Sequence, residues 1–135
     1  MIAWVYRAGD ALRRLRRNDA GRNGEDLAHR YLRRRGCTVV ARNHRPRAGG
    51  VELDIVAWHG ATLVFVEVKT RATDEFGTPD RAVDLEKQGY LVRAARDYCR
   101  RAEVEWDCVR FDVVSIVMTQ PPRIEWIQDA FSGGA

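Results

Sequence analysis

Two carboxylates and a lysine whose spacing could bring them together lie within one short stretch of the chain, residues 51–69, VELDIVAWHGATLVFVEVK. Asp54 lies in its first half, and Glu67 and Lys69 stand two residues apart in its second half. Hard divalent cations such as Mg²⁺ bind carboxylate oxygens, and water and substrate phosphate complete the coordination shell. Such a metal lowers the pKa of a bound water and neutralises charge on phosphate oxygens, and a lysine beside it can stabilise developing negative charge. The three residue types therefore suit metal-dependent hydrolysis of a phosphodiester.

The same stretch predicts a β-hairpin that would bring these side chains together. Both of its halves alternate between two faces and are rich in β-branched residues, which indicates two strands with a tight turn at His59-Gly60. A two-residue turn would place Asp54 across from Phe65 and diagonal to Glu67, whereas a four-residue turn would place Asp54 directly opposite Glu67. Either even count keeps Asp54, Glu67 and Lys69 on one face, and an odd count would not.

A solvated outer face of an antiparallel sheet would explain the same alternation. Two observations favour a site instead. Trp58 and Phe65 occupy the same face toward the turn, so we expect that part to be covered and the charged cluster to lie at the rim of a cleft. The chain also contains 21 Arg and only 2 Lys, one of which is Lys69. An ammonium group changes its pKa readily, unlike a guanidinium, and so suits a catalytic position.

The spacing Asp54, twelve residues, Glu67-x-Lys69 resembles the D…(D/E)-x-K signature of the restriction-endonuclease-like nuclease superfamily. A wider pattern resembles one bacterial family, the uncharacterised YraN-type proteins. It comprises Gly24-Glu25, Ala28, Tyr31-Leu32, Asn43, Glu52-Leu53-Asp54-Ile55-Val56-Ala57, the string FVEVKTR (65–71), Phe76-Gly77, Lys87, Arg110-Phe111-Asp112-Val113-Val114 and Ala130-Phe131. The match covers about residues 20–131, and FVEVKTR is its most specific part. One departure is Val51, where the family has glycine, but no expected metal ligand is lost.

The resemblance implies a fold, a site and a reaction. The expected fold is α/β, a restriction-endonuclease-like core with a mixed central sheet of about five strands flanked by helices, similar to Holliday-junction resolvases. The expected site has Asp54 and Glu67 as ligands of Mg²⁺ or Mn²⁺, Lys69 as activator, and Glu25 as an accessory catalytic and metal-binding residue. Without the resemblance, Glu25 would be read as a helix-start carboxylate that the macrodipole favours. A homodimer would let two such sites cut two strands.

Composition sets further bounds on function. A chain of 135 residues makes one domain with a sizeable core. A net charge of +4, due almost entirely to arginine, permits nucleic-acid binding, with DNA the expected partner. Arg42, Arg45 and Arg47 just before the hairpin and Arg71 just after it are the candidate phosphate contacts.

Cysteine usage and hydropathy bear on the compartment. Three scattered cysteines without metal-ligand spacing indicate reduced thiols and a cytoplasmic location. The sequence contains no apolar run of membrane-spanning length, so no membrane partner is expected.

Periodicity and turn residues divide the chain into an extension (1–20), the domain (21–131) and a disordered tail (132–135). The extension, with a short basic helix at 11–17, is either a phosphate-contacting arm or, more in keeping with termini generally, a loosely docked segment. The expected elements are a helix over 24–35 stopped by Gly36, a strand over 37–43, the hairpin, a helix from Thr78-Pro79 to Arg101, a strand over 108–118 buried on both faces, and an edge strand over 123–128. The buried stripe of the second helix comprises Ala82, Leu85, Leu91, Val92, Ala95, Tyr98 and Cys99.

Three functions from different classes are compatible with this pattern. The first is a metal-dependent endonuclease acting on branched or single-stranded DNA, the second a nucleic-acid-binding module that keeps the fold without chemistry, and the third a partner-binding scaffold with a structural charged face. The intact Glu67-x-Lys69 pair favours the first. The other lysine, Lys87, faces either the cleft or the surface, and His44 is a weaker candidate for a general base than for an ordinary exposed loop residue.

Overall fold

A computed structural model describes residues 11–47, 49–73 and 83–134 of the chain. Its elements follow in the order α1 (Ala11–Arg34), β1 (Cys37–His44), β2 (Leu53–His59), β3 (Thr62–Arg71), α2 (Leu85–Ala102), the short 3₁₀ helix η3 (Trp106–Cys108), β4 (Val109–Val117) and β5 (Arg123–Phe131). The expected order of helix, three strands, helix and two strands is therefore confirmed, as is the α/β class with a five-stranded mixed sheet.

The sheet has the strand order β1-β2-β3-β4-β5. Only β3 and β4 run parallel, and the other three neighbouring pairs are antiparallel. Parallel neighbours need a crossover, which α2 provides between β3 and β4. From Phe111 to Val117 every residue of β4 is buried, as its nearly continuous apolar sequence predicted, and β5 forms an edge, also as predicted.

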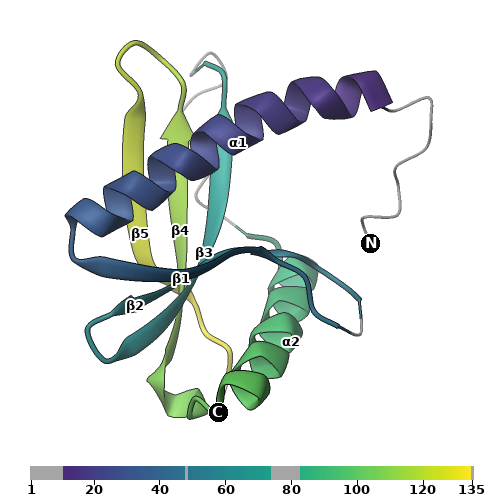
Figure 1. The fold of residues 1–135 in the computed structure, drawn as a ribbon, viewed down its shortest axis with the longest axis vertical. Helices are drawn as coiled ribbons and strands as arrows, with labels where there is room; N and C mark the ends of the chain where they lie inside the picture. Colours follow the sequence, from purple (N-terminus) through teal and green to yellow (C-terminus); the bar gives the residue numbers. More distant parts are fainter. Residues whose placement is uncertain (1–10, 48, 74–82, 135) are drawn as a thin grey trace.

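The two helices cover opposite faces of the sheet, with α1 lying across the strands in Figure 1. Ala28 and Leu32 of α1 pack with the strand residues Ile55, Ala57, Val64, Val66, Val114 and Ile116. Leu91, Ala95 and Cys99 of α2 pack with Val56, Leu63, Phe65, Phe111 and Val113. Residues that alternate along β2, β3 and β4 thus enter two separate cores, one under each helix.

Helix α1 begins at Ala11 and not at Gly24, so the basic segment and the expected first helix form one continuous element. Arginine, leucine and alanine are good helix formers and no proline interrupts the run, which explains the continuity. The predicted stop is confirmed, since Gly36 has φ +94°. Gly24 has a packing reason, because a Cβ there would lie 2.1 Å from Thr70 Oγ1 on β3.

Helix α2 begins at Leu85, later than the predicted start at Thr78-Pro79, which lies outside the described residues. Asp84 is the N-cap, and its Oδ1 accepts a hydrogen bond from the Lys87 N–H at 2.8 Å. The later start also corrects the predicted buried stripe, because Leu85, in the first turn, is 83% exposed. Leu91, Ala94, Ala95 and Cys99 form the buried stripe.

Gly133 and Gly134 lie against the side chain of Trp106. Trp106 Nε1 donates a hydrogen bond to the Gly134 carbonyl at 3.2 Å. A Cβ at Gly133 would lie 2.7 Å from the Trp106 ring and 2.8 Å from the Phe111 ring. Within the described part of the chain, no helix is long and apolar enough to cross a membrane.

Candidate active site on the β2–β3 hairpin

The register of the hairpin decides which side chains meet. The loop consists of Gly60 and Ala61, so that His59 pairs with Thr62 and Ile55 pairs with Val66. Continued by one residue, this register places Asp54 opposite Glu67. That is the arrangement predicted for the four-residue turn, although the loop itself has two residues, because His59 and Thr62 extend the strands by one further pair.

Asp54 and Glu67 form a pair of carboxylates in which Glu67 is buried and Asp54 is half-buried. Glu67 is only 6% exposed, and Asp54 Oδ2 accepts a hydrogen bond from the Val68 N–H at 2.9 Å. Burial and the adjacent Glu67 raise the pKa of Asp54 well above its ordinary value, against the opposing effect of the Val68 hydrogen bond. Two carboxylates held side by side in a partly buried position form a site that a cation would stabilise.

Lys87 is the functional residue that the sequence left undecided between cleft and surface. Its Nζ contacts Glu67 Oε2 directly, from a position 20 residues further along the chain. Burial acts to lower the pKa of Lys87, but the charges of Glu67 and Asp54 outweigh burial and raise it. The scarcity of lysine, which drew attention to Lys69, was an equal signal for Lys87.

The first turn of α2 positions Lys87. The Asp84 cap holds the Lys87 N–H, and the Gln88 side chain donates to the Val83 carbonyl at 2.7 Å. Both bonds fix the segment that enters the helix, so the ammonium group approaches Glu67 from an ordered turn.

Lys69 lies two residues beyond Glu67 on β3, on the same face by strand alternation. It is partly buried and pairs in register with Ser115 of the parallel strand β4. The hairpin thus brings Asp54, Glu67 and Lys69 to one face as expected, while the catalytic role of Lys69 stays a prediction.

Glu25 lies beside the carboxylate pair but is held by other residues. Its Oε1 is 3.7 Å from Arg42 Nη2. Burial raises the pKa of Glu25, opposed by a hydrogen bond with Asn43 and by the Arg42 charge. The Glu25 charge is also among those that raise the pKa of Asp54, so the two groups are neighbours without forming one cluster.

The donor set fits a hard divalent cation with two protein ligands. Within residues 11–47, 49–73 and 83–134, no group of three or more His, Cys, Asp or Glu side chains is arranged to hold a metal. Mg²⁺ commonly uses one or two carboxylates and takes its remaining ligands from water and substrate phosphate. Asp54 and Glu67 provide that minimum set, whereas Glu25, as placed here, does not add a third ligand.

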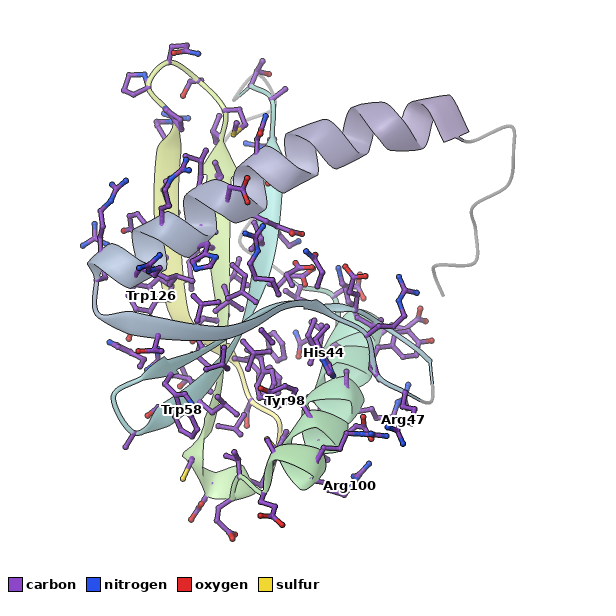
Figure 2. All side chains as sticks on the ribbon, viewed as in Figure 1. His44, Arg47, Trp58, Tyr98, Arg100 and Trp126 are labelled. Atoms are coloured by element: carbon purple, nitrogen blue, oxygen red, sulfur yellow. The ribbon has the colours of Figure 1, made fainter. Side chains whose placement is uncertain are left out.

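The four arginines expected to contact phosphate differ in their surroundings. Arg42 is held by α1, with its Nη2 2.8 Å from Asp26 Oδ1 and its Nη1 3.4 Å from His29 Nδ1. Arg45 pairs with Glu52 at 3.1 Å, and Arg71 is partly buried at the end of β3. Arg47 is exposed on the loop between β1 and β2, where Figure 2 labels it.

His44 packs edge-on against Tyr98 of α2, with ring centroids 5.1 Å apart and an interplanar angle of 88°. Figure 2 shows the two rings together behind β1. This contact gives His44 a place in the packing between β1 and α2.

A second buried carboxylate, Asp112, belongs to a structural network. Arg110 donates from Nε and Nη2 to its two oxygens at 2.9 and 2.8 Å. The Trp126 Nε1 and the Asp129 N–H also donate to Asp112, at 2.8 and 2.9 Å. These four donors satisfy the Asp112 carboxylate within the fold and fasten β5 to β4 across a bulge.

The geometry defines an α/β protein with a mixed five-stranded sheet and a cluster of Asp, Glu and Lys side chains on its β2–β3 hairpin. A model of the Uncharacterised protein family UPF0102 matches residues 24–116, and the chain belongs to that family. The match contains Glu25, the whole hairpin, Lys87 and Asp112. The resemblance to the YraN-type family is thereby confirmed.

Relatives from several bacteria extend this match. A UPF0102 protein of Solibacter usitatus is 58% identical over 132 residues, which are 97% of this chain and 100% of the relative. A UPF0102 protein of Rhodococcus opacus is 45% identical over 82% of this chain and 94% of its own length. A UPF0102 protein of Geobacter sulfurreducens is 47% identical over 82% of this chain and 87% of its own length. Their similarity extends beyond the hairpin to most of the domain.

Proposed function

We propose that this protein is a metal-dependent endonuclease of the restriction-endonuclease-like superfamily that hydrolyses phosphodiester bonds in DNA. The observation that carries the proposal is the Asp54–Glu67 pair, with the Lys87 ammonium in contact with the buried Glu67 and with Lys69 two residues after Glu67 on the same face. Branched or otherwise structured DNA is the proposed substrate, Mg²⁺ or Mn²⁺ the cofactor, and the cytoplasm the location. A homodimer, in which two sites act on two strands, is part of the proposal.

Each residue has a distinct part in the proposed reaction. Asp54 and Glu67 would hold the cation, which when bound acidifies water and neutralises charge on the scissile phosphate. The Val68 N–H fixes the orientation of Asp54, and Lys87 fixes that of Glu67. Lys69 would orient the attacking water or stabilise the charge that develops on the phosphate.

Glu25 stays an accessory ligand in this proposal. To join the metal shell, its carboxylate must exchange the partners Arg42 and Asn43 for the cation.

A nucleic-acid-binding module without chemistry is the second candidate, and one observation favours it. Lys87 already provides a cationic partner for Glu67, and the described residues offer no three-ligand metal cluster. A protein that uses Lys87 in place of a metal would keep the fold and its basic surface and lack cleavage.

A cleavage assay separates the two candidates. The wild type, the double variant Asp54→Asn/Glu67→Gln and the control Glu86→Gln, an exposed carboxylate on α2, are incubated with Mg²⁺ or Mn²⁺. The substrates are duplex, single-stranded, flap and four-way-junction DNA, with RNA of the same sequences. A nuclease requires cleavage by the wild type and the control but not by the double variant.

The other outcomes are equally distinct. Equal cleavage by all three proteins would reveal a contaminating nuclease. If the wild type binds DNA but does not cleave it, the nucleic-acid-binding module is the supported function. Light scattering on the same preparation tests the homodimer, which a monomer at working concentration would exclude.

A further inference from the structure

A hollow of about 560 Å³ lies between α2 and the loop that joins β1 to β2. The loop contributes Gly49 and Gly50, and α2 contributes Arg93, Arg96 and Arg100. Spacings of three and four residues place these arginines along one side of the helix. We call this hollow the α2 groove.

The α2 groove carries an excess of positive charge. Among the residues that the structure describes, its one acidic lining residue is Asp97, which is paired within α2, 3.4 Å from Arg100 Nη2 and 3.2 Å from Arg101 Nε. The side chain of Arg100 is nevertheless 71% exposed, and Arg93 is exposed as well. The exposed Arg47 adds a further cation on the loop, and Figure 2 shows it on the same side of α2 as Arg100.

Aromatic rings orient two of these guanidinium groups. Arg96 lies over the Trp106 ring, 4.1 Å from its centroid, and Arg93 lies over the Tyr90 ring at 4.9 Å. Stacking on a ring reduces the conformational freedom of a long side chain, so less entropy is lost when its guanidinium group binds an anion. The α2 groove is therefore a partly organised row of donors.

The α2 groove adjoins the candidate active site through both of its walls. Val51 lines the groove, and β2, which carries Asp54, begins two residues later at Leu53. Tyr90 lines the groove and follows Lys87 by three residues, about one helical turn. A ligand extended along the α2 groove would thus reach the Asp54–Glu67 pair at one end.

A second arginine cluster provides a contrast. Arg30, Arg33 and Arg34 of α1 line a shallower hollow of about 310 Å³. Helix α1 covers the other face of the sheet from α2, and Asp54, by strand alternation, shares the α2-facing side with Val56. The α1 cluster contains the same number of arginines as the α2 groove, but it lies on the opposite face of the sheet from α2.

We propose that the α2 groove binds the phosphodiester backbone of a nucleic-acid strand, with Arg93, Arg96 and Arg100 contacting successive phosphates. The seven steps from Arg93 to Arg100 rise roughly 10 Å along the helix, which is the axial length of about three stacked nucleotides. This inference rests on the proposed function in taking the bound strand to be the substrate. It assigns the phosphate contacts chiefly to α2, whereas the sequence predicted such contacts for Arg42, Arg45, Arg47 and Arg71.

The test compares two triple variants that remove equal charge. Arg93→Gln/Arg96→Gln/Arg100→Gln empties the α2 groove of guanidinium groups, and Arg30→Gln/Arg33→Gln/Arg34→Gln is the matched control on α1. Anisotropy of a labelled single strand and of a labelled four-way junction is measured in EDTA over a series of KCl concentrations. EDTA prevents cleavage, so that binding is read alone.

The α2 variant is expected to bind at least tenfold more weakly than the wild type. The slope of log K against log [KCl] should fall in magnitude by about 2 to 3, because each lost phosphate contact contributes roughly 0.7 to 0.9. The α1 variant should stay within about threefold of the wild type. Unchanged binding by the α2 variant, or an equal loss in both variants, would overturn the inference.

A charge-preserving variant guards against loss of folding. Arg93→Lys/Arg96→Lys/Arg100→Lys keeps the cations and should keep the salt slope of the wild type. If the glutamine variant unfolds by circular dichroism, the exposed pair Arg93→Gln/Arg100→Gln replaces it, with an expected slope change of about 1.5 to 2.

The inference and the nuclease fail differently. Binding through the α2 groove without cleavage in Mg²⁺ or Mn²⁺ would keep the inference and remove the enzyme. If the wild type cleaves DNA but the α2 variant binds DNA as tightly as the wild type, the nuclease is supported and the inference is overturned. If the wild type binds neither the single strand nor the four-way junction, the inference is overturned.

Discussion

Asp54 shows how a residue suited to a functional site can oppose folding. Its half-buried carboxylate lies beside Glu67, and desolvation together with the Glu67 charge raises its pKa. The folded state therefore binds the Asp54 proton more tightly than the unfolded state does. Between the ordinary value of 3.8 and the raised pKa of the folded state, the Asp54 contribution to stability falls as pH rises.

Asp54→Asn is accordingly expected to stabilise the protein at pH 7 in EDTA. The asparagine oxygen can still accept the Val68 N–H, and the repulsion with Glu67 disappears. We expect a gain of about 0.5–2 kcal/mol in the free energy of unfolding, the usual range when a strained functional group is replaced. Urea denaturation from pH 4 to pH 8 measures it, and the gain should shrink toward pH 4, where Asp54 is protonated. A variant less stable than the wild type at pH 7 would contradict this account.

Lys87 is expected to compete with a metal for Glu67. Lys87→Met leaves Glu67 buried without its cationic neighbour, and because the Lys87 side chain is 43% exposed we expect a loss of only about 1–2 kcal/mol. Mn²⁺ should then raise the melting temperature of Lys87→Met more than that of the wild type, since the ammonium no longer occupies Glu67 Oε2. Lys87→Arg, which keeps the charge, is the control. Equal Mn²⁺ shifts in all three proteins would show that Lys87 and the metal do not share a ligand.

At the scale of elements, two short features set the positions of the strands and helices. Gly24 lets α1 approach β3 at Thr70, and the Asp84 cap starts α2 where Lys87 can reach Glu67. The Asp112 network performs a similar task between β4 and β5, joining the strands at the bulge where their regular pairing is interrupted. Each of these three features fixes how two elements of the fold lie against each other.

Asp112→Ala should be strongly destabilising. The substitution leaves the Arg110 guanidinium, the Trp126 indole N–H and the Asp129 N–H without their acceptor. Removing one partner of a buried charge pair costs about 3–5 kcal/mol, which urea denaturation can measure. Asp107→Ala, at an exposed carboxylate near the same strand, should change stability by less than about 0.5 kcal/mol. Comparable effects of the two substitutions would refute the structural role of the Asp112 network.

Across the whole molecule, the two sides of the sheet have different tasks. The face under α1 contains a mainly apolar core and the Arg110–Asp112 network. The face under α2 carries the Asp54–Glu67–Lys87 cluster and adjoins the α2 groove. The proposed function therefore concerns chiefly the α2 face, to which α1 adds the accessory residue Glu25.

A truncation tests how much of α1 the fold requires. Deletion of residues 1–18 removes eight residues of the helix, whereas the α1 residues in the buried core, Ala28 and Leu32, lie further along. We expect the melting temperature to stay within about 5 °C of that of the full chain, equivalent to about 1 kcal/mol. A larger drop in thermal unfolding would mean that the first turns of α1 contribute to packing.

The sequence by itself determined the elements that depend on local pattern. Alternation along 51–69 predicted the hairpin and the shared face of Asp54, Glu67 and Lys69. The apolar run of β4 predicted its burial, and Gly36 predicted the end of α1. These predictions hold because residues two to four apart in the chain decide periodicity, caps and turns.

The tertiary structure decided the partners of the charged residues. The contact of Lys87 with Glu67 spans 20 residues, that of His59 with Arg110 spans 51, and Arg42 is bound by α1 in place of a ligand. The start of α2 at Leu85 differs from the start predicted at Thr78-Pro79, and the register that places Asp54 opposite Glu67 was one of two that the sequence left open. Charges carry no periodic signal, and a Coulomb interaction depends on distance in space, which only the packing of α1, α2 and the sheet establishes.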